Sequence, residues 1–227
     1  MSRSTLNDQL ITDSNPKSPI SEAYKILRTN IEFSNVDEKI QTIMVTSTKM
    51  SEGKSTTSAN LAVTYAQSNK RVLLIDADLR KPTQHHIFKL SNRFGLTSLL
   101  SHQNDLDHVL LQTSVDNLSV IPSGPIPPNP SEMLASKRMT ALLEELKQRF
   151  DIIIIDTPPV LAVTDAQIVA AQCDGVIMVI DSGKVKKEAA LKAKASLEKV
   201  KARLIGIVLN NIKRNSAEGY YYYYGER

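Results

Sequence analysis

The sequence has one cysteine and no long hydrophobic run. These absences argue against a disulfide-bonded protein and against a membrane-spanning one. Its one cysteine, Cys173, cannot form a disulfide within the chain, so it suits a reducing cytosol, and we interpret it as a packing residue. The first fifteen residues are polar and lack the apolar core of a signal peptide. No run approaches the ~18 apolar residues that a membrane-spanning helix needs. We therefore expect a cytoplasmic protein that reaches a membrane only through something else.

Net charge is also small, at +4 over 227 residues. This mildly basic balance permits an acidic partner or a membrane surface, but it is too weak to indicate nucleic-acid binding, and we expect no nucleic-acid partner. A hydrophobic content of 41% with 23% charged residues is ordinary for a globular protein. The length favours one main domain.

The stretch from Ile43 to Thr57 predicts a phosphate-binding loop. A short run rich in β-branched residues leads into a polar loop that ends in Gly53-Lys54-Ser55, and a helical pattern follows at once. In that order, the loop amides and the helix N-terminus point at an anion. The usual pattern has a glycine five residues before Gly53, where this chain has Thr48. The alternative is a plain helix N-terminus capped by Ser47 or Ser51.

The loop residues have distinct chemical roles in the phosphate-binding interpretation. Gly53 lets the backbone approach the phosphates, Lys54 can reach the β- and γ-phosphates, and the Ser55 hydroxyl can ligate Mg²⁺. We expect a continuous run to bind the nucleotide, namely Ser51, Glu52, Gly53, Lys54, Ser55 and Thr56.

Alternating strands and helices predict the fold class. Apolar strands are expected near 72–76, 117–122, 151–156, 175–181 and 204–209, with helices near 18–31, 55–66, 165–171 and 186–199 and another ending at 149. This alternation predicts an α/β fold with a doubly wound, mostly parallel sheet of P-loop NTPase type and helices on both faces. We expect a flexible N-terminal segment over 1–17, the P-loop domain over 18–212, and a flexible tyrosine-rich tail over 213–227.

Three aspartates follow two of the predicted strands, at the sheet edge where such folds bind ligands. Asp156 ends an all-apolar strand and is placed like a Walker B acid that touches Mg²⁺ directly or through water. Either Asp76 or Asp78 is then left to orient or deprotonate the attacking hydroxyl. Singly, each could be a strand-end turn residue. Together with Lys54 they predict a catalytic ATP site that uses Mg²⁺.

Three ordered motifs resemble the Walker A, A′ and B motifs of bacterial tyrosine kinases, the cytosolic kinases of capsule and exopolysaccharide systems. They are Thr46–Thr56, Leu73–Arg80 and Ile153–Pro159. The family's loop usually reads Pro-Gly-Glu-Gly-Lys-Ser, whereas Met50-Ser51 replaces the Pro-Gly here. The resemblance implies a kinase domain over 18–212 that uses ATP and Mg²⁺ and autophosphorylates on tyrosine. It favours Asp76 as the base, with Asp78 nearer the metal beside Ser55 and Asp156.

The resemblance also implies contacts with other molecules. The family's Glu-x-x-Arg-x-x-Arg contact of a ring-shaped oligomer is matched by Glu22, Lys25 and Arg28, and the alternative is a solvated helix face with an ion pair. Asn210 stands where related ATPases contact adenine, or it is a turn residue. A separate transmembrane activator of the polysaccharide chain-length-regulator type would bring the kinase to the inner face of the membrane.

Five of the seven tyrosines stand in a row near the C-terminus: Tyr220, Tyr221, Tyr222, Tyr223 and Tyr224. Five exposed aromatic residues on a loose end favour aggregation, so their presence asks for a reason. One alternative is a tail that packs back onto the body. We expect instead that these tyrosines are phosphoacceptors that reach the active site of a neighbouring subunit, with other protein substrates possible.

A nucleotide-switched positioning ATPase of the partition and division type is the alternative function. Lys49 falls where those proteins keep a signature lysine. However, the loop lacks their paired glycines, and the tyrosine run has no role there. A non-catalytic adaptor is disfavoured because Lys54, Ser55 and the three aspartates are all intact.

Overall fold

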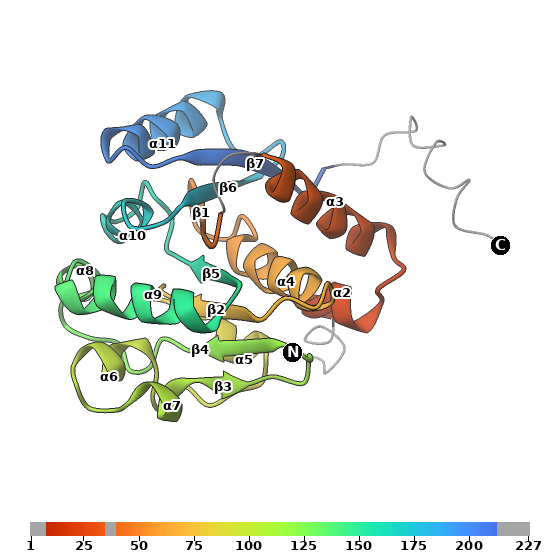
Figure 1. Ribbon diagram of the computed structural model, residues 1–227. Helices are drawn as coiled ribbons and strands as arrows, with labels where there is room; N and C mark the ends of the chain where they lie inside the picture. The colour runs from red at the N-terminus through yellow and green to blue at the C-terminus, as the bar shows by residue number, and fades with distance from the viewer. Residues whose placement is uncertain (1–7, 35–39, 213–227) are drawn as a thin grey trace.

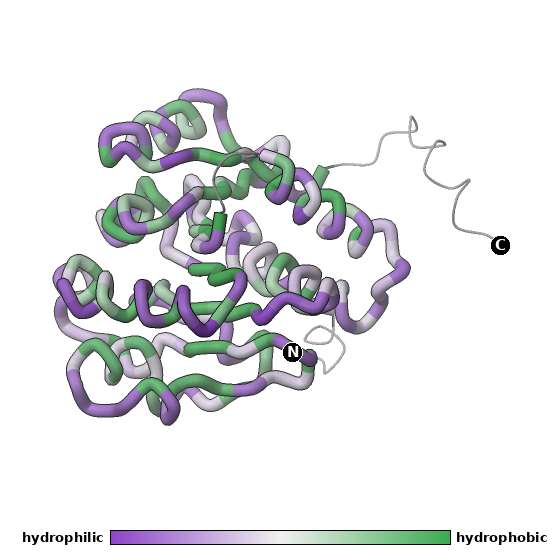
Figure 2. Tube along the Cα trace, in the orientation of Figure 1, coloured by the Kyte–Doolittle hydropathy of each residue, from purple (hydrophilic) through white to green (hydrophobic). Residues whose placement is uncertain are grey.

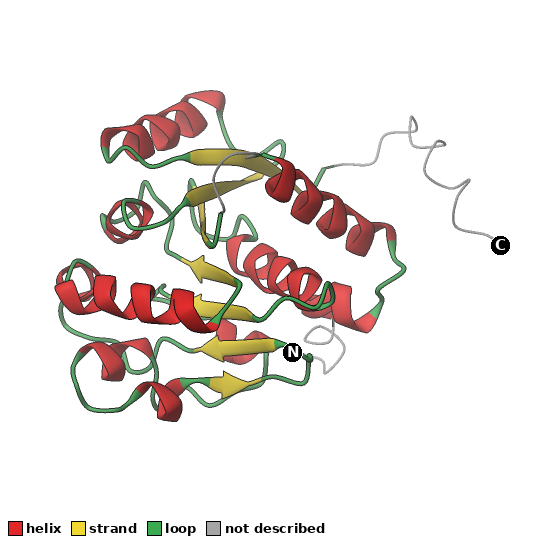
Figure 3. Ribbon diagram, in the orientation of Figure 1, coloured by secondary structure: helices red, strands yellow, loops and turns green. Residues whose placement is uncertain are grey.

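The computed structural model describes residues 8–34 and 40–212. Within these residues a seven-stranded sheet forms the centre of the molecule, with helices on both faces (Figure 1, Figure 3). Its strands are β1 (Thr42–Ser47), β2 (Val72–Asp76), β3 (Leu111–Gln112), β4 (Leu118–Ile121), β5 (Ile152–Asp156), β6 (Gly175–Asp181) and β7 (Leu204–Asn210). The spatial order is β3-β4-β2-β5-β1-β6-β7, with β3 antiparallel to β4 and the other pairs parallel. The predicted doubly wound, mostly parallel α/β fold is confirmed.

The helices form two layers. One face of the sheet carries η1 (Asp8–Leu10), α2 (Ile11–Ser14), α3 (Pro19–Phe33), α4 (Lys54–Ala66) and α5 (Gln84–Ile87). The other carries α6 (Leu96–Leu100), α7 (Leu106–Val109), α8 (Pro130–Leu134), α9 (Lys137–Arg149), α10 (Asp165–Ala170) and α11 (Lys187–Lys199). None of the helices in the described part of the chain combines the length and apolar character needed to cross a membrane.

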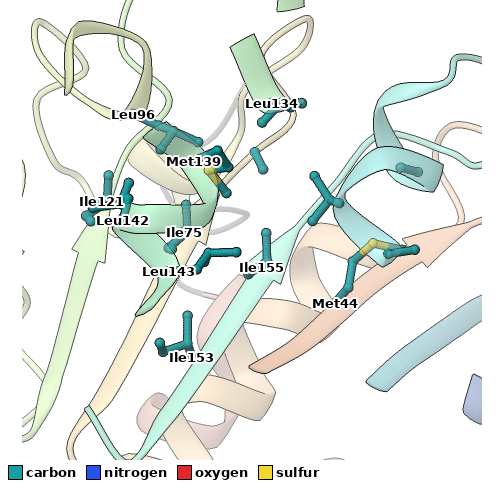
Figure 4. Close-up of a cluster of buried hydrophobic side chains, with 14 of the residues drawn as sticks. Met44, Ile75, Leu96, Ile121, Leu134, Met139, Leu142, Leu143, Ile153 and Ile155 are labelled. Carbon is teal, nitrogen blue, oxygen red and sulfur yellow. The ribbon is translucent and has the colours of Figure 1, made fainter. Parts of the chain in front are cut away.

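Strand side chains point alternately into two cores. In β1, Ile43 and Val45 face the α4 side, while Met44 faces the α9 side. Figure 4 shows Met44 and Ile155 in the core that Leu142 and Leu143 of α9 help to close. Because both faces are covered, the central strands are mostly hydrophobic, and green predominates along them in Figure 2. Burying each such side chain contributes about 1.5–3 kcal/mol, which fixes the strand register.

Cys173 packs against the same core, and burial raises the pKa of its thiol. This environment agrees with its interpretation as a packing residue.

The N-terminal segment differs from its prediction. Residues 8–17 were expected within a flexible stretch, but Asp8–Ser14 is helical and packs on α4. Thr12 is buried, and its amide and hydroxyl donate hydrogen bonds to Asn60 Oδ1 at 3.1 and 2.9 Å. Asn60 Nδ2 in turn donates to the Gln9 carbonyl at 2.7 Å. Residues 8–17 therefore belong to the described domain, which does not begin at 18.

The strand order brings the predicted site residues together. β5 lies between β1 and β2, and Asp76 is the direct register partner of Asp156. The loop after β1 leads into α4 at the same sheet edge, because parallel strands all end there. Residues from three distant segments of the chain thus meet at one place.

Candidate active site

The loop between β1 and α4 is braced from within by Glu52. This side chain is 3% exposed, and its carboxylate accepts hydrogen bonds from the Thr48 amide, the Thr48 hydroxyl and the Lys49 amide. Glu52 was predicted to bind nucleotide. In this structure its carboxylate holds the loop closed on itself, and a contact of its backbone with a nucleotide stays a prediction.

Two residues of the loop have positive φ angles. Gly53 has φ +92° and Ser51 has φ +65°. Glycine adopts this region freely, whereas serine does so at a cost. Asn210 lies next to Gly53, and its Nδ2 donates a hydrogen bond to the Glu52 carbonyl at 3.0 Å. The amide of Asn210 therefore holds the loop in this structure, and its contact with adenine stays a prediction.

The helix that follows the loop offers unpaired amides to an anion. The Thr57 amide donates to the Gly53 carbonyl at 2.8 Å, which is the first hydrogen bond of α4. The amides of Lys54, Ser55 and Thr56 precede that bond, so helix geometry directs them out of the N-terminus. This arrangement suits the phosphates of a nucleotide.

Lys54 connects the loop with the aspartates. Its Nζ lies 2.9 Å from Asp78 Oδ2, 3.7 Å from Asp156 Oδ1 and 3.0 Å from Ser55 Oγ. Burial alone would lower the pKa of Lys54, but the charges of Asp156 and Asp78 raise that pKa above its usual value. The lysine is thus held in its cationic form at the centre of the site.

Asp76 is fully buried, as is Asp156, each at 0% exposure. Burial and then the charge of Asp156 raise the pKa of Asp76 to about 7, against the hydrogen bonds that the Gln84 and Thr83 amides donate to Oδ2. Within the described part of the chain, its Oδ1 accepts one long hydrogen bond, from the Asp78 amide at 3.2 Å. A carboxylate with a pKa near neutrality can accept a proton under physiological conditions.

Two polar residues complete the site, and no sequence pattern pointed to either. Gln84 is fully buried, and its Nε2 donates to Asp156 Oδ2 at 2.8 Å and to the Ser55 carbonyl at 3.1 Å. Ser58 donates to the Lys54 carbonyl at 2.9 Å and lies 3.3 Å from Asp156 Oδ1. The contacts that Gln84 and Ser58 make with Asp156 join residues far apart in sequence, so periodicity and spacing carry no signal for them.

The donor set fits a magnesium–nucleotide complex. Ser55, Asp78 and Asp156 present hard oxygen atoms around Lys54. Across residues 8–34 and 40–212, no group of three or more histidine, cysteine or acidic side chains is arranged to hold a metal ion alone. Mg²⁺ is usually bound through one or two carboxylates together with phosphates and water, and Asp78 and Asp156 could supply such carboxylates.

Known proteins are similar to this chain in sequence and in overall fold. A family model described as an AAA domain matches residues 38–205. Tyrosine-protein kinase YwqD of Bacillus subtilis (strain 168) is 48% identical over 224 residues, covering 99% of this chain and 94% of YwqD. The crystal structure of the chimerical protein CapA2B2 is 43% identical with a TM-score of 0.89, covering 91% of each chain.

The chain belongs to the bacterial tyrosine-protein kinase family. Its likeness to the cell division ATPase MinD of Pyrococcus furiosus is weaker, at 24% identity and a TM-score of 0.67 over 78% of this chain and 74% of MinD. That likeness shows a common fold and no more. Relatives above 30% identity are named as tyrosine kinases, which favours the kinase interpretation over the positioning ATPase.

The other predicted residues of this family member lie outside the cluster. Glu22 and Lys25 form an ion pair with each other at 3.2 Å on the exposed side of α3. Arg28 Nη1 donates to the Thr64 carbonyl of α4 at 2.8 Å, so part of its guanidinium serves its own subunit. The tyrosines at 220–224 lie outside the described residues.

Proposed function

We propose that this chain is an ATP-dependent protein-tyrosine kinase that autophosphorylates Tyr220–Tyr224 in trans and regulates the synthesis of capsular or exopolysaccharide. The observation that carries the proposal is the cation of Lys54 held between Asp78 and Asp156 at the N-terminus of α4. Phosphoryl transfer depends on such charge positioning more than on covalent chemistry.

In this proposal the loop amides and Lys54 bind the β- and γ-phosphates of ATP. Ser55, Asp78 and Asp156 hold Mg²⁺, which neutralises phosphate charge when bound. The tyrosine oxygen forms a bond to the γ-phosphorus, the bond from that phosphorus to the bridging oxygen breaks, and ADP leaves. Asp76 accepts the phenol proton, which its pKa of about 7 allows.

Phosphorylation in trans needs a neighbouring copy, and the exposed side of α3 offers a surface for one. Ile26 and Phe33 are 43% and 78% exposed, and helical spacing puts them on the same side of this helix as Glu22. Exposed apolar side chains that gather on one helix favour a protein contact. We propose a ring of copies that meet through Glu22, Lys25 and the part of the Arg28 guanidinium that does not bond to the Thr64 carbonyl.

Phosphorylation would then change the assembly. Each phosphotyrosine adds about −1.5 to −2 charges, so three or four outweigh the net +4 of the chain. We expect a ring held by tails in neighbouring sites to dissociate on phosphorylation. Size-exclusion chromatography before and after ATP treatment measures this, and an unchanged oligomer contradicts it.

A membrane protein of the polysaccharide chain-length-regulator type is the proposed activator. It would recruit this cytoplasmic kinase to the inner face of the membrane. One solved relative is a chimerical protein named CapA2B2, and a protein made from more than one part is compatible with such an activator. We also propose that tyrosines of other proteins can serve as substrates, because the same transfer step applies to any phenol that reaches the site.

The test is incubation with ATP and Mg²⁺, with and without the activator's cytosolic segment, read by phosphotyrosine mass spectrometry. A mixture of two variants tests transfer in trans. The first is full-length Lys54→Met, which cannot transfer phosphate, and the second is active protein lacking Tyr220–Tyr224. Labelling of the Lys54→Met tail supports the proposal, and each variant alone is the control. Phosphate release without tyrosine labelling favours the positioning ATPase.

A further inference from the structure

Gln84 contacts all three motifs of the site. Its backbone amide donates to Asp76 Oδ2 at 2.9 Å, and its side-chain Nε2 donates to Asp156 Oδ2 and to the Ser55 carbonyl. One residue of the short helix α5 thus holds an acid of the second motif, an acid of the third, and the first turn of α4.

The opposite atom of the same amide has no partner. Gln84 Oε1 is buried and accepts no hydrogen bond from the described residues. Turning the amide over would place this oxygen against two acceptors, Asp156 Oδ2 and the Ser55 carbonyl, and would lose both bonds. The orientation is therefore fixed by its neighbours. A buried amide oxygen without a donor costs about 1–3 kcal/mol, so this one calls for an explanation.

We propose that Gln84 is a positioning residue of the magnesium–nucleotide site. Its Nε2 fixes Asp156 and the backbone of Ser55, and its Oε1 accepts a hydrogen bond from a water ligand of the metal. Mg²⁺ keeps several waters in protein sites, and groups that orient its ligands affect metal affinity strongly. This role rests on the proposed function, because it requires the metal to bind beside Ser55 and Asp156.

The test separates metal-dependent from metal-independent nucleotide binding. The affinity for a fluorescent ADP analogue is measured for wild type and Gln84→Met, once with Mg²⁺ and once with EDTA. Methionine keeps the unbranched shape but removes the donor and the acceptor. We expect the affinity in Mg²⁺ to fall about 10-fold, and the affinity in EDTA to fall by a clearly smaller factor.

Gln172→Met is the matched control. Gln172 Nε2 also donates to two carbonyls, those of Leu134 and Ile168 at 3.1 Å each, but it lies away from the site. The same chemical change there should leave both affinities unchanged. If Gln84→Met fails to fold by circular dichroism, Gln84→Asn replaces it. Asparagine is one methylene shorter and cannot span Asp156 and Ser55, so the same loss is expected.

The outcomes distinguish the two hypotheses. Equal losses with and without Mg²⁺, or no loss at all, overturn the role of Gln84 and leave the kinase proposal standing. If the wild-type protein itself binds the analogue no better with Mg²⁺ than with EDTA, the proposed function fails as well.

Discussion

Replacing Gly53 by alanine should destabilise the protein by an amount that the structure divides into two parts. At φ +92° an L-residue is strained by about 1–2 kcal/mol. The new Cβ would also lie 2.1 Å from Asn210 Nδ2, which must move and release the Glu52 carbonyl. Losing that hydrogen bond costs about 1 kcal/mol, so the whole change should cost about 2–3 kcal/mol.

Two further variants separate these parts. Gly183→Ala is the matched control, because Gly183 has φ +79° and nothing lies within 4 Å of a Cβ there. It should show the backbone strain alone, about 1–2 kcal/mol. Asn210→Ala should show the lost hydrogen bond alone, about 1 kcal/mol.

The double variant Gly53→Ala/Asn210→Ala decides the question. If the reasoning holds, the hydrogen bond is lost only once, and the double variant costs about 1 kcal/mol less than the sum of the single variants. Equilibrium unfolding in urea measures the wild type and all four variants. Strict additivity, or a Gly53→Ala cost no larger than that of Gly183→Ala, would refute the proposed contact.

Three further changes test other parts of the structure. Ser51→Gly should relieve about 1–2 kcal/mol of strain against about 0.5–1 kcal/mol of added chain entropy, and so raise Tm by about 2 °C in a calorimetric scan; a lower Tm contradicts the strained loop. Burial would raise the pKa of Asp165, but hydrogen bonds from Arg80 lower it below its usual value, so this pair stabilises the fold above pH about 4 and loses its effect in acid. Arg80→Met should lower the free energy of unfolding by about 2 kcal/mol at pH 7, a figure already reduced for solvent screening because the Arg80 side chain is 41% exposed. In urea unfolding, the difference from wild type should shrink as the pH falls below about 4, and a constant difference contradicts this. Asn60→Ala removes both Thr12 bonds and should cost about 2 kcal/mol, with faster proteolysis of residues 8–17 while nucleotide affinity stays unchanged; unchanged proteolysis contradicts the anchor.

The sequence predicted the parts of the site that follow from strand topology. Asp76 and Asp156 both end apolar strands, and parallel strands of one sheet end at one edge. That rule was enough to place the two acids together, and the structure makes them register partners. The Gly-Lys-Ser run likewise needed only its position between a strand and a helix.

Contacts that depend on side-chain direction could not be predicted in the same way. Glu52 looked like a ligand residue because of its place in the loop, but its carboxylate turns inward to the Thr48 and Lys49 amides. The anchor of the N-terminal segment joins Thr12 to Asn60 across 48 residues. The polar composition of residues 8–17 indicated flexibility. A single buried partner such as Asn60 produces no periodic pattern in the sequence, so this anchor could not be predicted.

The departure of the loop from the family pattern has a physical resolution. At the position where the resemblance led us to expect glycine, Ser51 adopts φ +65°, the conformation that glycine would enter freely. Such strain persists only where the surroundings determine the backbone. Here the Glu52 carboxylate accepts a hydrogen bond from the Thr48 amide at the start of the loop, and Asn210 Nδ2 donates to the Glu52 carbonyl near its end. The loop therefore keeps the path that presents Lys54 to the aspartates, and the substitution costs stability while the placement of Lys54 is retained.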